Sequence, residues 1–81
     1  MTKKELKEVA SKKEITRSDA RELLIHVFDN NYYKLGEATN LHPIFLKEML
    51  TFVKIFSEDA QNRIKQASLK LLDPKLKKKN K

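Results

Sequence analysis

Residues 43–56 read PIFLKEMLTFVKIF and form the apolar centre of the sequence, with nine large apolar side chains in fourteen positions. On a helical wheel with about 100° per residue, these side chains cover roughly two thirds of the circumference. A helix at a protein surface needs an apolar stripe only about 100° wide. The stretch is therefore expected to be either a central helix surrounded by others or a helix that also contacts another chain.

The length and the residue types restrict the class of protein. A chain of 81 residues is expected to fold as one domain with a small core. With no cysteine and two histidines, we expect no disulfide framework, no metal site and no cofactor. No apolar run approaches about 18 residues, and the lysine-rich start lacks the apolar region of a signal peptide, so we expect a cytoplasmic protein without a membrane span. The sequence has no phosphate-binding glycine loop and no nucleophile–base spacing, which argues against an enzyme or a small-molecule substrate.

The net charge of +7 is concentrated at the end of the chain. Residues 74–81 contain five lysines and no acid, whereas residues 1–73 contain 13 basic and 11 acidic residues, a net charge of +2. We expect residues 1–73 to form the helical domain and residues 74–81 to form a basic disordered tail. Lysine outnumbers arginine fifteen to three, which suits non-specific attraction better than bidentate base recognition.

Helix caps and scarce loop residues predict an all-α fold, a small bundle of four or five helices. The sequence has one glycine and two prolines. Thr2 and Thr16 each begin a possible capping box, and Pro43 suits the first position of a helix with His42 as its cap. The expected helices span about residues 3–13, 17–30, 32–40, 43–56 and 58–73.

The region around Ser57 leaves two alternatives open. Ser57 is able to cap a new helix whose first turn carries two acids. Alternatively, one helix runs from Pro43 to about Asp73, because apolar positions recur every three or four residues and form a heptad-like seam. The seam positions are Leu46, Met49, Val53, Phe56, Ala60, Ile64, Ala67 and Leu71.

The stretch Tyr32–Thr51 resembles the helix-turn-helix of bacterial and phage regulators. Gly36 occupies the small position where the first helix touches the second, and Asn40 occupies the turn. Asparagine tolerates the left-handed conformation usual at that position. The apolar positions of the motif are filled by Leu35, Leu41, Leu46 and Met49. The resemblance implies a three-helix core within residues 17–56.

The same resemblance implies a small DNA-binding transcription regulator of the kind that phages and plasmids encode. Residues at the start of the first motif helix, Tyr33 and Lys34 among them, would lie near phosphate. The second helix would turn His42, Ile44, Lys47, Glu48 and Thr51 toward the bases. The tail would add electrostatic contacts. The expected DNA-binding residues are Tyr33, Lys34, His42, Ile44, Lys47, Thr51, Lys75, Lys77, Lys78 and Lys79.

A protein-interaction module is the alternative, because Thr39 is polar where the motif is usually apolar and Ile44 lies on the face meant for bases. Such a module would bind and inhibit another protein, such as a host replication or transcription factor. The excess of apolar residues also predicts self-association, with a homodimer as the expected form. The expected protein-interface residues are Phe45, Phe52, Ile55 and Phe56.

Overall fold

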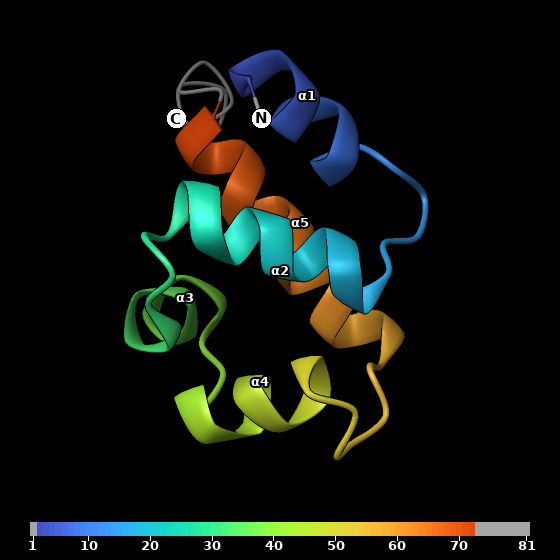
Figure 1. Cartoon of the computed structure of the whole chain (residues 1–81), viewed down its shortest axis with the longest axis vertical. Helices are drawn as coiled ribbons and strands as arrows, with labels where there is room; N and C mark the ends of the chain where they lie inside the picture. The colour runs from blue at the N-terminus through green and yellow to red at the C-terminus, as the bar shows by residue number, and fades with distance from the viewer. Residues whose placement is uncertain (1, 73–81) are drawn as a thin grey trace.

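The computed structural model of the protein describes residues 2–72, within which the chain forms five α-helices and no strand. The predicted all-α fold, a small bundle of four or five helices, is confirmed (Figure 1). The helices are α1 (Lys3–Ala10), α2 (Arg17–Val27), α3 (Tyr32–Thr39), α4 (Pro43–Leu50) and α5 (Glu58–Leu72). The predicted basic tail, which includes Lys75, Lys77, Lys78 and Lys79, lies outside the described residues.

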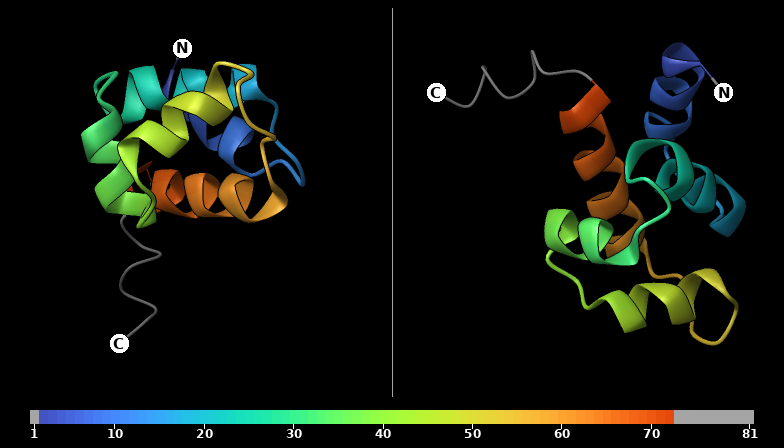
Figure 2. Two further views of the ribbon diagram at one scale, coloured as in Figure 1. Left: turned by 90° about the horizontal axis from the view of Figure 1, so that it is seen from below. Right: turned by 60° about the vertical axis from the view of Figure 1, so that its left-hand side comes forward.

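Helix α5 is the centre of the bundle. It packs against α1, α2 and α3, while α4 packs against α2 and α3. Figure 1 and the right-hand view of Figure 2 place α1 and α4 at opposite ends of the molecule. Of the two alternatives for residues 43–56, a central helix surrounded by others is therefore wrong, and contact with another chain stays a prediction.

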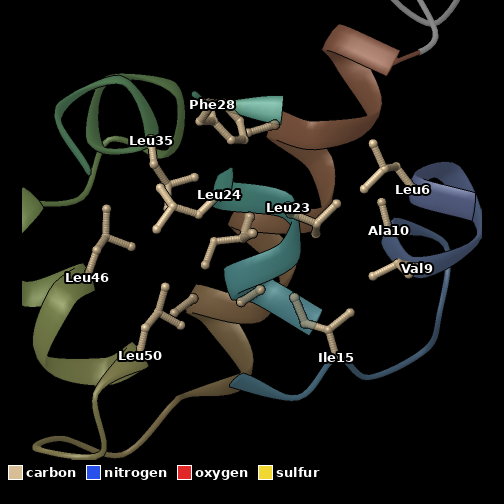
Figure 3. Packing of buried hydrophobic residues seen from close by; sticks show 14 of the residues in the cluster. Leu6, Val9, Ala10, Ile15, Leu23, Leu24, Phe28, Leu35, Leu46 and Leu50 are labelled. Atoms are coloured by element: carbon tan, nitrogen blue, oxygen red, sulfur yellow. The ribbon is translucent and has the colours of Figure 1, made fainter. Parts of the chain in front are cut away.

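One apolar core joins all five helices (Figure 3). Each helix contributes one face, in the spacing of an amphipathic helix. The fully enclosed side chains include Leu23 and Leu24 of α2, Leu35 of α3, Leu46, Met49 and Leu50 of α4, and Ile64 of α5. Tyr32 packs partly against this core, while Tyr33 is exposed, so one of the two neighbouring rings faces the core and the other faces solvent.

The first two helices begin at the predicted capping boxes. The Thr2 hydroxyl accepts a hydrogen bond from the Glu5 N–H, and the Glu5 carboxylate accepts one from the Thr2 N–H. Thr16 and Asp19 exchange the same pair of bonds at the start of α2. These bonds satisfy backbone donors that a helix start leaves free.

The next two helices also start where predicted. The Asn31 side chain accepts hydrogen bonds from the first turn of α3. His42 Nδ1 accepts one from the Ile44 N–H, 3.1 Å away, and Pro43 occupies the first turn of α4. Proline suits this place because its missing N–H would have no partner within the helix.

Helices α1 and α2 end earlier than predicted, at Ala10 and Val27. After α2, Asp29 and Asn30 adopt left-handed backbone angles, with φ of 56° and 55°. The Asn30 N–H donates to the Leu24 carbonyl at 2.8 Å and closes the helix end. This hydrogen bond, made between residues close in sequence, ends α2 at Val27 and not at residue 30 as expected.

The apolar stretch 43–56 is broken after α4. The N–H groups of Val53 and Lys54 both donate to the Glu48 carbonyl, at 2.8 and 3.1 Å. Phe52 adopts a left-handed φ of 70° and turns the chain away from the helix axis. Of the two alternatives at the end of this stretch, the break is correct.

The predicted heptad-like seam across residues 46–71 is consequently wrong. A new helix, α5, starts where Ser57 Oγ accepts a hydrogen bond from the Ala60 N–H at 3.2 Å. Between the two helices, Val53 is 68% exposed, and Phe56 packs partly against the core from a loop. A seam requires one continuous helix, and the loop at 51–57 separates its two halves.

The capping carboxylate of α2 makes the stability of the protein sensitive to acid. Asp19 Oδ2 lies 3.2 Å from Lys12 Nζ and accepts the Thr16 N–H at 3.0 Å. Burial raises the pKa of Asp19, but the bonds from Thr16 and Lys12 and the charge of Lys12 outweigh it and lower the pKa below its ordinary value. The unfolded chain then binds the proton more readily, so this stabilisation is complete above the ordinary carboxyl pKa of about 4 and is lost as the pH falls below it.

We expect Asp19→Asn to lower the free energy of unfolding by about 0.5–1.5 kcal/mol at pH 7, because the charge-assisted bonds are lost. The variant should also lose less stability than the parent protein between neutral pH and pH values below about 4. Urea denaturation followed by circular dichroism across this range measures both effects. Glu37→Gln, at an exposed position of α3, is the control. An unchanged pH dependence in the Asp19 variant would contradict the assignment.

Candidate functional site

Helices α3 and α4 are joined by a tight turn of three residues, 40–42. Asn40 adopts the left-handed conformation, with φ of 60° and ψ of 37°. The Leu41 N–H donates to the Gly36 carbonyl at 3.1 Å. The predicted turn position of Asn40 and the start of α4 at Pro43 are both observed.

Gly36 lies where α3 meets the turn and the start of α4. A Cβ atom at this position would lie 2.7 Å from the Leu41 carbonyl oxygen and 3.2 Å from Pro43 Cγ. The first distance is shorter than real Cβ contacts, and its partner is a backbone atom. The absent side chain of Gly36 therefore sets how closely α3 approaches the turn.

Thr39 is the polar residue at a usually apolar position of the motif. Its side chain is buried, and its hydroxyl donates to the Leu35 carbonyl at 2.8 Å. The Thr39 carbonyl in turn accepts a hydrogen bond from Arg63 of α5 at 3.1 Å. Because the hydroxyl is satisfied within its own helix, the polar residue is compatible with the core.

The outward face of α4 presents most of the residues predicted to meet DNA. Leu46, Met49 and Leu50 face the core, which leaves the opposite side of the short helix to solvent. The exposed predicted residues are His42, Ile44, Lys47 and Thr51. Ile44 is 62% exposed. We call these four residues, together with the half-buried Glu48, the α4 face.

The start of α3 lies beside this face. A shallow groove of about 530 Å³ has Tyr33 and Lys34 of α3 on one side and His42 and Pro43 of α4 on the other. Tyr33 is exposed, and the Lys34 ammonium lies 2.6 Å from the Asp29 carboxylate. The structure thus brings the predicted α3 and α4 residues to one side of the molecule.

The formal charge of α3 and α4 is balanced. Lys34 and Lys47 provide two positive charges, and Glu37 and Glu48 provide two negative ones. Glu48 lies 3.9 Å from the Lys54 ammonium in the following loop. Attraction between this side of the molecule and phosphate therefore depends on how the individual lysines are placed.

The predicted protein-interface residues differ in exposure. Phe52 and Ile55 are 73% and 85% exposed, whereas Phe45 is 36% exposed and Phe56 packs partly against the core. The loop after α4 therefore presents large apolar side chains to solvent. Phe56 instead packs partly against the core and so connects this loop to it.

Arg17 of α2 holds the loop in place. Its Nε donates to the Met49 carbonyl at 2.7 Å, and its Nη2 donates to the Lys54 carbonyl at 3.0 Å. Its guanidinium also lies over the Phe52 ring, 4.6 Å from the ring centroid. One side chain thus contacts the last turn of α4, the middle of the loop and the exposed Phe52 ring.

Sequence reasoning did not identify Arg17, Arg21 or Ile25 as part of any site. Arg17 and Met49 are 32 positions apart, and no local pattern pairs an arginine with carbonyls at that distance. Ile25 is 43% exposed on α2, beside two residues that face the core. The sequence offers one indication of this exposure: Ile25 is apolar but does not belong to the stripe of α2 residues that faces the core.

Within residues 2–72, no helix combines the length and apolarity needed to cross a bilayer. In the same range, His, Asp and Glu side chains do not gather in groups of three that would hold a metal ion. No protein-family model, curated protein or solved structure matches the chain.

Proposed function

We propose that this protein binds duplex DNA, with α4 entering the major groove and α3 lying against the backbone beside it. The observation that carries the proposal is the turn between these helices. Asn40 is left-handed, and Gly36 approaches the Leu41 carbonyl more closely than any larger residue permits. In a helix-turn-helix, such a turn lets the first helix pack closely against the start of the second, which then offers its outer side to the groove.

The α4 face contains side chains of the types that contact bases. Lys47 is a cation able to donate to guanine acceptors, the Thr51 methyl and hydroxyl suit several base edges, and Ile44 suits a thymine methyl group. Lys34 and the Tyr33 hydroxyl lie on the flank where phosphates pass in this binding mode. With Lys47 as its single cation, the α4 face would recognise sequence weakly, and much of the affinity would be electrostatic.

The five lysines of residues 74–81 would add to that electrostatic affinity. If they neutralise up to about five phosphates, the logarithm of the binding constant falls against the logarithm of the salt concentration with a slope of roughly −4 to −5. A chain that ends at residue 73 would then bind all sequences more weakly and with a flatter salt dependence. We propose that a small transcription regulator, of the kind that phages and plasmids encode, is the function that uses this binding.

A second candidate function uses the same face for a protein partner. The formal charges of α3 and α4 cancel, and Ile44 is 62% exposed at the centre of the face. An exposed apolar side chain among balanced charges is typical of an interface anchor. In this reading, Ile44 and Phe45 enter a pocket on another protein, and Lys47 lies at the rim.

Titration against random duplex DNA at two salt concentrations separates the two functions. For DNA binding, we expect Lys47→Ala to weaken affinity by about 1–3 kcal/mol, because a contact made only by this cation is lost. Ile44→Ala should retain nearly full affinity. The matched control is Lys4→Ala, which removes the same charge from α1. This helix lies at the opposite end of the molecule from α4 (Figure 1).

Melting curves of each variant show whether the fold is intact. Lys47 and Ile44 are both exposed, so their truncation should leave the melting temperature nearly unchanged. A folded Lys47 variant that binds DNA as tightly as the Lys4 variant would overturn the DNA proposal. The protein-binding function would then be the better account of the α4 face.

A further inference from the structure

A second surface lies on the far side of the Phe52 loop and faces α2. It consists of Arg17, Arg21 and Ile25 from α2 and of Phe52 and Ile55 from the loop; we call it the loop surface. Its three apolar side chains are all substantially exposed. It shares no residue with the α4 face, although Phe52 directly follows Thr51 in the chain.

The loop surface has the shape of a receptor for side chains. Two hollows share Arg17, Ser18 and Phe52 in their linings. The hollow beside Ile25 has a volume of about 240 Å³, and the hollow beside Ile55 and Phe56 has a volume of about 480 Å³. Apolar anchors of a partner fill concave sites of this kind, whereas an isolated exposed residue offers no such site.

The loop surface is also held in one conformation. Phe52 keeps a left-handed backbone, the next two residues donate to the Glu48 carbonyl, and Arg17 spans the segment with two hydrogen bonds. A bulky residue at positive φ is sparsely populated in proteins and persists where its surroundings impose it. Such preorganisation reduces the conformational entropy lost when a partner binds.

The charge of the loop surface selects the partner. Across residues 2–72, no carboxylate lies within 4.0 Å of the Arg17 or Arg21 guanidinium. Glu22, which also lines the hollow beside Ile25, lies 3.2 Å from the His26 imidazole and is not paired with either arginine. The two arginines therefore offer donors to carboxylates from outside, beside hollows that take apolar side chains.

We propose that the loop surface binds an acidic amphipathic segment of a partner protein. Apolar side chains of the segment enter the hollows on either side of Phe52, and its carboxylates pair with Arg17 and Arg21. A second copy of this chain fits poorly, because a two-fold contact would bring two copies of the same arginine-bearing patch together. Duplex DNA would satisfy the arginines and leave Phe52 and Ile55 without an apolar contact.

Selection from a display library of random 16-residue peptides, with the full chain as bait, tests the proposal. The selected peptides should carry a net negative charge with apolar residues at helical spacing. Their affinity should fall at least about tenfold for Phe52→Gly and for Arg21→Glu. Glycine suits the left-handed backbone at position 52, so this variant should melt at or above the temperature of the parent protein.

A charge-swapped peptide is the control. Replacing the acids of a selected peptide by lysine should abolish binding to the parent protein and restore binding to the Arg21→Glu variant. Selection of no peptides, or of peptides unaffected by both variants, would overturn the proposal. A dimer of the parent protein that Phe52→Gly no longer forms would also overturn the proposal. The same holds if Phe52→Gly and Arg21→Glu each lose as much DNA affinity as Lys47→Ala. Peptide binding without DNA binding would leave this inference intact and remove the proposed function.

Discussion

Replacing Ile64 by alanine is expected to lower the free energy of unfolding by about 2–5 kcal/mol. Ile64 is completely enclosed in α5, the helix that packs against α1, α2 and α3. Truncation removes buried methyl groups and leaves a cavity that closely packed helices fill only in part. A domain of this size has a total stability of about 4–11 kcal/mol, so the variant approaches the limit of folding.

Urea denaturation followed by helical circular dichroism measures this effect. The midpoint should fall while the slope stays constant, because the folded and unfolded states keep their surface areas. Ile55→Ala makes the same chemical change at a position that is 85% exposed, and it should alter stability by no more than about 0.5 kcal/mol. Equal midpoints for the two variants would show that α5 is not the centre of the core.

Replacing Gly36 by alanine should destabilise the protein by about 2–3 kcal/mol, in the upper part of the range for overpacked sites. In a free helix, the same replacement would stabilise by about 1 kcal/mol. Here the new Cβ would lie 2.7 Å from the Leu41 carbonyl oxygen, so α3 and the turn have to move apart. The sign of the effect therefore distinguishes close helix contact from helix propensity.

The Gly36 variant should also bind DNA more weakly, because the turn sets the position of α4. Thermal melting and the DNA titration measure the two effects separately. Glu37→Ala changes the adjacent exposed position of α3 and should have little effect on stability. A Gly36→Ala protein that melts above the parent would refute the close approach of the two helices.

Local chemistry explains what could be predicted from the sequence. A capping box is completed within four residues, and proline acts on its own backbone, so helix starts at Thr2, Thr16, Asn31 and His42 follow from short stretches. The turn at Asn40 is equally local. The exposure of the α4 face also follows from helical spacing once the start of the helix is known.

Long-range packing explains the features of the fold that could not be predicted from the sequence. The buried side of α5 includes Ala60, Ala67 and Ser68, whose small side chains let three helices approach closely. A search for large apolar residues points instead to residues 43–56. The break after α4 depends on Phe52 in a left-handed conformation, which phenylalanine rarely adopts and which Arg17 supports from 35 positions earlier in the sequence.

The position of α5 in the chain has a consequence for how the protein is made. Helices α1, α2 and α3 leave the ribosome first, yet each of them buries its apolar face against α5. Until residues 58–72 are synthesised, these helices lack the partner that they share, although α2 is able to pack against α1 and α4, and α3 against α4. The complete core, which includes residues of all five helices, therefore forms only after synthesis has reached α5.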